Sequence, residues 1–133
     1  MLPQLWGPHL WKSIHYIALG YPKSPKEEDM INYKFFYTNL WKFIPCMKCA
    51  LNYKRHLEEL PIDSFLISNS KLFEWTVELH NIVNKELGKP TMNKEVALKL
   101  YTAQPFKFGT SKVAVGILVI IIICFALYLH STK

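Results

Sequence analysis

Cysteine is scarce in this chain, which has three cysteines in 133 residues. Three are too few for a disulfide scaffold, and Cys124 lies inside an apolar run, so that only Cys46 and Cys49 can carry out thiol chemistry in contact with water. The sequence also lacks a GxGxxG dinucleotide motif, a haem-attachment CxxCH motif and an iron–sulfur cysteine set. Any redox chemistry therefore starts from these two cysteines.

The basic residues form no long run. The formal net charge is +6 at pH 7, but lysines and arginine are scattered and mixed with acidic residues such as Glu27, Glu28, Glu58 and Glu59. A protein that binds nucleic acid usually has its basic residues clustered in a patch or stripe. The pattern therefore argues against a nucleic-acid partner.

The two ends of the sequence differ in character. The N-terminal stretch MLPQLWGPHLWKSIH has no basic start, no unbroken apolar core and no small-residue cleavage site, so it is unlike a secretory signal. The uncharged apolar run from Val113 to Leu129 is just long enough to cross a bilayer as a helix, which takes about 17–25 residues. We expect a single-pass membrane anchor with the folded domain facing the cytosol.

A chain of this length holds one compact domain and little else. We place the folded domain at residues 1–104, a linker at 105–112 and a transmembrane helix at 113–130.

Hydrophobic periodicity predicts helices throughout the folded domain, because apolar residues recur every three or four positions and no stretch alternates with period two. Glycine and proline divide the pattern. The first predicted helix ends near Gly20. The second has Pro25 and the acidic residues 27–29 in its first turn and runs to about Phe43, and the third starts at Cys46 and ends before Pro61. The fourth begins after the polar stretch 68–70 and closes at Gly88, and a short fifth runs from 93 to 101.

The predicted fold is all-α: a four-helix bundle with a short fifth helix, followed by a C-terminal transmembrane helix. The second helix carries Ile31, Phe35, Leu40 and Phe43 together with other aromatic residues. We therefore expect it to be buried on more than one side.

Cys46 and Cys49 form a CxxC motif at the predicted start of the third helix. The positive end of the helix dipole favours a thiolate on the first cysteine, and Lys48 adds positive potential. The first cysteine is then the natural partner for exchange with the thiol of another protein, while the second can face a buried cofactor.

Zinc sites and thioredoxin-like sites also contain CxxC motifs. Zinc needs four ligands, so that His15, His56 or His80 would have to complete the set, and the sequence has no second CxxC and no closely spaced histidine pair. A thioredoxin-like motif lies in a βαβ unit, whereas this sequence predicts helices. These patterns favour a redox pair and predict no metal site.

The segment WTVELHNIVNKELGK, residues 75–89, places His80 and Asn84 in one helical row beside an apolar row. The two could hydrogen-bond a heteroaromatic ligand, or they could be satisfied polar residues in a helix contact. Trp11 and His15 repeat the combination of an aromatic ring and an imidazole on the first helix. Together the two pairs predict a flat, aromatic-lined slot between helices, where bundles place cofactors.

Three blocks of the sequence resemble the Erv/ALR family of FAD-linked sulfhydryl oxidases. They are GPHLWKSIHYIALGYP at 7–22, FIPCMKC at 43–49 and FEWTVELHNIVNKELGKP at 73–90, in the order of the family and at about its spacings. The combination is far more specific than any block alone. The resemblance covers about residues 5–92 and implies a compact helical fold around one non-covalent FAD.

The resemblance implies that Cys49 is the sulfur nearest the flavin and that Cys46 exchanges with incoming thiols. It implies that FAD is bound by residues of the first and fourth helices. These are Trp11, His15, Trp75, His80, Asn81, Val83, Asn84, Lys85 and Lys89. It also implies oxidation of protein thiols, transfer of the electrons to dioxygen with release of hydrogen peroxide, and a homodimer.

The chain departs from the family pattern after about residue 90. Many members have a second, structural cysteine pair there and a late Arg-Trp contact with FAD, and the segment TMNKEVALKLYTAQPF has neither. An extra cysteine pair in a flexible arm is missing too. The core pair must then meet its client protein directly or through a small dithiol carrier protein.

Short versions with a membrane span resemble those of large DNA viruses, which form disulfides in the reducing host cytosol. This resemblance implies a location in a virion or viral-factory membrane.

Two hypotheses follow from the sequence. The first is an FAD-dependent thiol oxidase. The second is a non-enzymatic membrane adaptor whose CxxC is structural or binds zinc, which the apolar tail and the missing second cysteine pair suggest.

Overall fold

The computed structural model describes residues 1–103, Ile123 and His130. Contacts divide the chain into two units, Met1–Thr102 and Ala103–Lys133. The first contains all the elements named here. They are α1 (Pro3–Leu19), α2 (Glu27–Asn39), η1 (Leu40–Phe43), α3 (Met47–Glu59), η2 (Asp63–Phe65), α4 (Asn69–Glu86) and α5 (Lys94–Thr102), where η marks a short 3-10 helix. In the described part of the chain, the predicted helical fold with five helices is confirmed.

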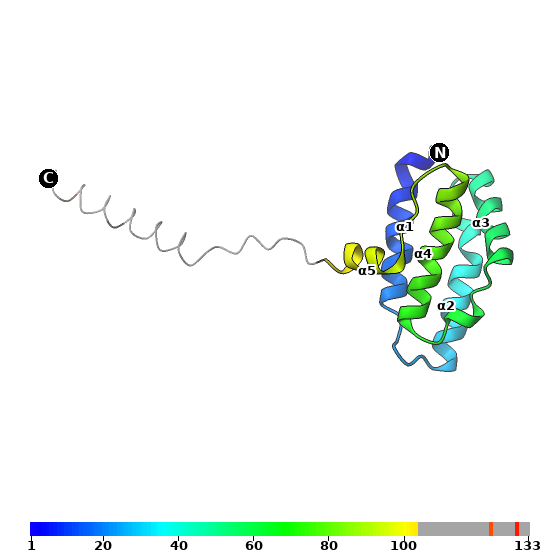
Figure 1. The fold of residues 1–133 in the computed structure, drawn as a ribbon, viewed down its shortest axis with the longest axis horizontal. Coiled ribbons are helices and arrows are strands. Elements are labelled where there is room, and N and C mark those ends of the chain that lie inside the picture. The colour runs from blue at the N-terminus through cyan, green and yellow to red at the C-terminus, as the bar shows by residue number, and fades with distance from the viewer. Residues whose placement is uncertain (104–122, 124–129, 131–133) are drawn as a thin grey trace. The chain divides into compact units, whose positions relative to one another are not determined.

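Helices α1 to α4 lie side by side, and consecutive helices run in opposite directions (Figure 1). The short helix α5 lies beside α1 and α4, on the opposite side of the bundle from α3 (Figure 1). Buried apolar side chains from all four long helices fill the space between them. This core includes Ile14, Ala18, Tyr37, Leu40, Tyr53, Leu72, Phe73, Trp75, Val77 and Leu79.

Hydrogen bonds from buried aromatic side chains join neighbouring helices. The hydroxyl of Tyr37 on α2 donates to the carbonyl oxygen of Ile14 on α1 over 2.9 Å. The hydroxyl of Tyr53 on α3 donates to the carbonyl oxygen of Tyr37 over 3.1 Å. The indole Nε1 of Trp75 on α4 donates to the carbonyl oxygen of Leu60, just after α3, over 3.0 Å. These bonds satisfy polar groups that would be costly to bury alone, and they fix how the helices pair.

Local signals in the sequence set the helix ends. The side chain of Ser68 caps α4 by accepting from the backbone N–H of Lys71 at 3.3 Å. Gly88, which has a φ of 64°, lies just beyond α4, where a left-handed residue is favourable only for glycine. The predicted ends of α1, α3, α4 and α5 agree with the structure within one or two residues.

The prediction for the second helix was wrong in two respects. α2 ends at Asn39, and the 3-10 helix η1 continues to Phe43. Ile31, Phe35 and Phe43 are 60%, 69% and 77% exposed rather than buried. The reason is that Tyr37 and its neighbours on one side of α2 fill the space against α1 and α3, so Ile31 and Phe35, one turn apart, point outward.

No helix within the described residues is long and apolar enough to cross a membrane. The predicted linker at 105–112 and, apart from Ile123 and His130, the predicted transmembrane helix at 113–130 lie outside the described residues.

Removing one buried hydroxyl tests the connection between α2 and α1. Tyr37→Phe should lower the free energy of unfolding by about 1 kcal/mol with an unchanged m-value, because the Ile14 carbonyl loses a buried donor. Urea denaturation measures both quantities. Tyr16→Phe, at an exposed position, is the control and should change neither, so equal losses in the two variants would contradict the role of Tyr37.

Candidate active site

The CxxC motif forms a disulfide at the start of α3. Cys46 is the N-cap residue, Cys49 lies in the first turn, and the disulfide joins them with their Cα atoms 5.2 Å apart. Both residues are half-buried. The backbone N–H of Cys49 donates to Sγ of Cys46 over 3.3 Å. The sulfur of Cys46 therefore occupies the place that a capping oxygen takes at other helix starts.

The residues before the pair explain this position. Pro45 excludes helical geometry at Ile44, which is extended with φ −72° and ψ 119°. Cys46 is also extended, with φ −152° and ψ 108°, so that α3 begins at Met47. The positive end of the α3 dipole therefore lies at the disulfide, where it favours the thiolate form of Cys46 once the disulfide is reduced.

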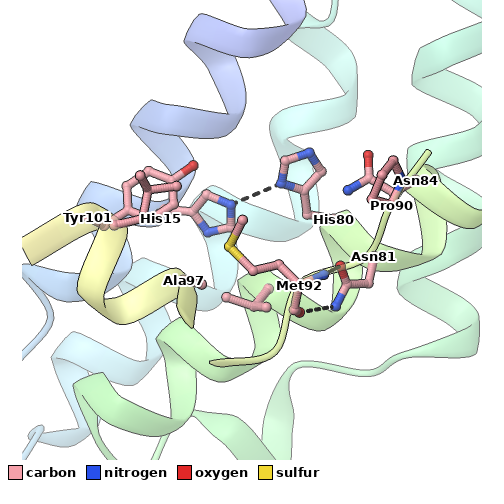
Figure 2. A pocket seen from close by; sticks show the side chains of 10 residues that line it. His15, His80, Asn81, Asn84, Pro90, Met92, Ala97 and Tyr101 are labelled. Atoms are coloured by element: carbon pink, nitrogen blue, oxygen red, sulfur yellow. Dashed lines mark hydrogen bonds between the residues drawn. The ribbon is translucent and has the colours of Figure 1, made fainter. Parts of the chain in front are cut away.

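An aromatic cluster joins α1 to α4. The rings of Trp11 and His80 stack with 4.1 Å between their centroids and 5° between their planes. Nε2 of His15 lies 3.1 Å from Nδ1 of His80, the hydrogen bond between these two rings in Figure 2. The structure thus brings Trp11 and His15 of α1 together with His80 of α4, residues that lie far apart in the sequence.

Thr76 determines which ring nitrogens carry protons. Its hydroxyl donates to the carbonyl oxygen of Phe73 over 2.7 Å, so it accepts from Nδ1 of His15, 2.9 Å away. His15 then offers the lone pair of Nε2, and His80 donates to it from Nδ1. This assignment, made from the hydrogen-bond geometry, leaves Nε2 of His80 as an acceptor.

Burial keeps both imidazoles uncharged at neutral pH. Desolvation, with a smaller contribution from His80, lowers the pKa of His15 to about 3. Desolvation, with a smaller contribution from the charge of Lys89, lowers the pKa of His80 to about 4. The cluster therefore presents flat neutral rings and neutral hydrogen-bonding groups, which suit a heteroaromatic ligand.

A pocket of about 70 Å³ lies beside this cluster, between α1, α4 and α5 (Figure 2). Asn81 holds part of its wall in place, because its amide donates to the carbonyl oxygen of Met92 over 2.7 Å and accepts from the Met92 N–H at 3.0 Å. The pocket is lined by His15, Val77, His80, Asn81, Asn84, Pro90, Met92, Ala97, Leu100 and Tyr101. Four of the residues predicted to bind a cofactor thus share one pocket.

The other predicted cofactor-binding residues on α4 and just after it are placed differently. Trp75 is fully buried among core residues and donates to the backbone carbonyl just after α3, and it does not line the pocket. Val83 is half-buried, and Lys85 is exposed. Lys89 is exposed too, although its charge acts on His80. Contacts of all nine predicted residues with FAD stay predictions.

Thr76 and Tyr101 are site residues that the sequence reasoning missed. The ring of Tyr101, near the end of α5, lies 4.6 Å from that of His15. Nothing local in the sequence points to this contact, because it joins distant parts of the chain. Thr76 could have been found, since it lies four residues before His80 and eight before Asn84, in the same helical row.

Within the described residues, no group of three or more histidine, cysteine, aspartate and glutamate side chains is placed to hold a metal ion. His56, one of the candidates to join the cysteines at a zinc site, has its Nε2 3.0 Å from Oε1 of Glu86.

The low pKa of His15 predicts how stability depends on pH. In the unfolded chain this histidine titrates near its ordinary pKa of about 6.5. In the folded protein it stays neutral down to a pH of about 3. Between these values the unfolded state binds more protons, so the free energy of unfolding falls as the pH drops below about 6.5, by up to about 1.4 kcal/mol per pH unit. Above about pH 6.5 this histidine no longer makes the free energy of unfolding depend on pH.

Urea unfolding of the flavin-free protein between about pH 7.5 and 5 measures this slope. His15→Gln should reduce it, whereas His9→Gln, at an exposed position, should leave it as in the parent protein. An unchanged slope in His15→Gln would contradict a buried neutral imidazole.

Comparison with known proteins gives the site its context. The model of the Erv1 / Alr family matches residues 8–104. The chain is 39% identical over 100 residues to a "Probable FAD-linked sulfhydryl oxidase" of Acanthamoeba polyphaga mimivirus, a match that covers 74% of this chain and 70% of that protein. It is 33% identical over 90 residues to the "Mitochondrial FAD-linked sulfhydryl oxidase erv1" of Schizosaccharomyces pombe, with 68% and 50% covered.

Solved structures agree with these matches. The yeast Erv1 core superposes with a TM-score of 0.72 at 26% identity, covering 77% of this chain and 85% of that one. The FAD-binding domain of Erv1 from Saccharomyces cerevisiae superposes with a TM-score of 0.71 at 25% identity, covering 79% and 99%. With its family model matched across most of the helical domain and its fold shared with Erv1, this chain belongs to the Erv1/Alr family.

Proposed function

We propose that this protein is an FAD-dependent thiol oxidase that forms disulfide bonds in protein substrates and passes the electrons through FAD to dioxygen, with release of hydrogen peroxide. The observation that carries the proposal is the Cys46–Cys49 disulfide at the start of a helix in a domain with the Erv1 fold. Relatives named as FAD-linked sulfhydryl oxidases support it.

The residues at the aromatic cluster fit the chemistry of FAD. Trp11 and His80 provide flat ring faces, Nε2 of His80 accepts a hydrogen bond, and Asn84 adds an amide at the pocket. Lys85 and Lys89 would supply positive charge for the pyrophosphate. FAD is larger than a pocket of about 70 Å³, so we expect part of the cofactor to lie outside it.

Thiol exchange is carried out by the cysteines themselves. A client thiolate attacks Sγ of Cys46, the Cys46–Cys49 bond breaks, and Cys49 leaves as a thiolate. A second client thiolate then attacks the client sulfur of the mixed disulfide, so that the client disulfide forms and Cys46 leaves as a thiolate. The Cys49 N–H that points at Sγ of Cys46 stabilises this departing charge.

Bound FAD supplies the two-electron acceptor that returns the dithiol to the disulfide and delivers the electrons to dioxygen. The chain holds the reacting sulfurs at the helix end, and the neutral cluster of His15 and His80 keeps charge away from the rings that would hold the cofactor.

Flavin absorbance tests the function first. The purified full chain should be yellow, contain bound FAD and consume oxygen with dithiothreitol while producing hydrogen peroxide. Cys49→Ser should abolish turnover and keep FAD. When the client peptide is supplied as its disulfide, the Cys46 thiolate of this variant should attack it and hold a mixed disulfide, because no second cysteine of the pair is present to resolve it. Cys124→Ser is the matched control and should keep full turnover.

The adaptor hypothesis gives the opposite result. A folded, colourless protein that cannot be reconstituted with FAD and that holds stoichiometric zinc would overturn the oxidase.

We also propose that the oxidase is a homodimer formed through the outer face of α2. Ile31 and Phe35 form an apolar strip there, and large apolar residues exposed together on a helix usually mark a contact surface.

A charge placed in this strip should separate the protomers. Phe35→Glu is expected to halve the mass measured by light scattering and to leave the helical circular dichroism unchanged. Ile67→Glu, also at an exposed apolar position but outside α2, should keep the dimer mass. A monomeric parent protein would contradict the proposal.

We further propose that the domain of residues 1–104 is tied to a membrane by a helix at 113–130, through the linker 105–112, and faces the cytosol. The support is the uncharged apolar run from Val113 to Leu129. The similarity to a mimivirus protein supports a virion or viral-factory membrane as the location.

A further inference from the structure

Large exposed apolar side chains lie close to the disulfide in the sequence. Phe43 is 77% exposed, Met47 is 74% exposed and Leu51 is 55% exposed. Met47 directly follows Cys46, and Leu51 lies one turn further on the same face of α3. We call Phe43, Met47 and Leu51, together with the lysines at 42, 48 and 54, the α3 surface.

The charge of the α3 surface is entirely positive. The sequence between Asp29 and Glu58 contains no acidic residue. It does contain Lys42, Lys48 and Lys54. Within the described part of the chain, none of these three lysines forms an ion pair. By contrast, the two other basic residues of this stretch are paired: Lys34 with Asp63, and Arg55 with Glu59 and Glu86.

The ammonium groups of two of these lysines lie near the ring of Trp41. Nζ of Lys54 lies 5.1 Å from the centre of its ring and Nζ of Lys42 lies 5.8 Å from it. Since these lysines come from η1 and from the middle of α3, they lie on both sides of the disulfide in the sequence. Lys48 lies between the two cysteines.

We propose that the α3 surface is the docking site of the client protein and that it selects cysteines in apolar segments flanked by acidic residues. The proposal rests on the oxidase function proposed above and adds the substrate class. Apolar client residues would cover Met47 and Leu51, and the acidic flanks would meet the lysines. Acidic neighbours raise the pKa of a client thiol, and the lysines would offset this by favouring its thiolate as it approaches Cys46.

A second copy of the chain fits this surface poorly. In a two-fold symmetric contact the same patch faces itself, so that the lysines at 42, 48 and 54 would meet their own copies. Like charges placed opposite one another in an interface cost affinity, whereas acidic client residues gain it. The charge therefore favours a client over a second protomer.

Peptide oxidation by the flavin-loaded full chain tests the proposal. Two peptides of equal length carry the same cysteine pair and apolar residues, one with aspartate flanks and one with lysine flanks. The rate constant kcat/KM of each is divided by that for dithiothreitol. We expect this ratio to be about tenfold higher for the acidic peptide at low ionic strength, and the preference to shrink as salt is added.

Charge reversal gives the matched comparison. The double variant Lys42→Glu and Lys54→Glu should lose or invert the preference. The control double variant Lys23→Glu and Lys99→Glu, which makes the same change in net charge at exposed positions outside the α3 surface, should keep it. Equal ratios for both peptides in the parent protein, or a preference that survives charge reversal at 42 and 54, would overturn the proposal.

The apolar part is tested separately. Met47→Ser with Leu51→Ser should lower the ratio for the acidic peptide at every salt concentration, with an unchanged mass by light scattering. A change of mass instead would assign the surface to a contact between copies and overturn client docking. Failure of the oxidase itself is a different result: no flavin and no oxygen consumption with dithiothreitol.

Discussion

The rest of the site depends on the hydrogen bonds of the buried His15 imidazole. The hydrogen bond to Thr76 keeps the proton of His15 on Nδ1. Nε2 of His15 then accepts a hydrogen bond, which keeps the proton of His80 on its Nδ1. Because His15 is neutral and almost fully buried, it joins α1 to α4 without placing a charge in the core. The stacking of Trp11 on His80 follows from this contact, since the ring of His80 is already held by its own Nδ1.

A second set of buried contacts ties α3, which carries the cysteines, to the remaining helices. Tyr53 bonds α3 to α2, Tyr37 bonds α2 to α1, and Trp75 bonds α4 to the chain just after α3. His56, fully buried in the last turns of α3, bonds Glu86 at the end of α4. α3 is therefore anchored along its middle and its C-terminal part, while its N-terminal end keeps a half-buried disulfide at the surface.

The sequence was sufficient for the features that depend on neighbouring residues. The ends of α3 and α4 were predicted because Pro45, Ser68 and Gly88 act locally, through backbone geometry and capping. An aromatic-lined slot at Trp11, His15 and His80 was predicted because both helices carry an imidazole among aromatic residues and bundles place cofactors between helices.

The sequence could not show which of the many apolar residues of α2 would be buried in the core. α2 has more aromatic residues than α1 and α3 can cover, and periodicity alone gave no reason to prefer Tyr37 over Phe35. Tyr37 lies inside because its hydroxyl finds the carbonyl of Ile14, a partner known only once the helices are placed. The contact of Tyr101 with His15 was missed for the same reason, since α5 has no local signal for the face on which it lies.

The same competition explains why the α3 surface is exposed. Thiol exchange requires an incoming sulfur to approach the disulfide along the axis of its bond, so the residues around Cys46 cannot be covered by the protein's own core. Met47 and Leu51 lie outside because Ala50 and Tyr53, on the other side of α3, already fill the space against the bundle. An apolar surface left open beside a reactive disulfide would invite non-selective association. The lysines at 42, 48 and 54 counter this, because their like charges repel a second copy while still admitting an acidic client.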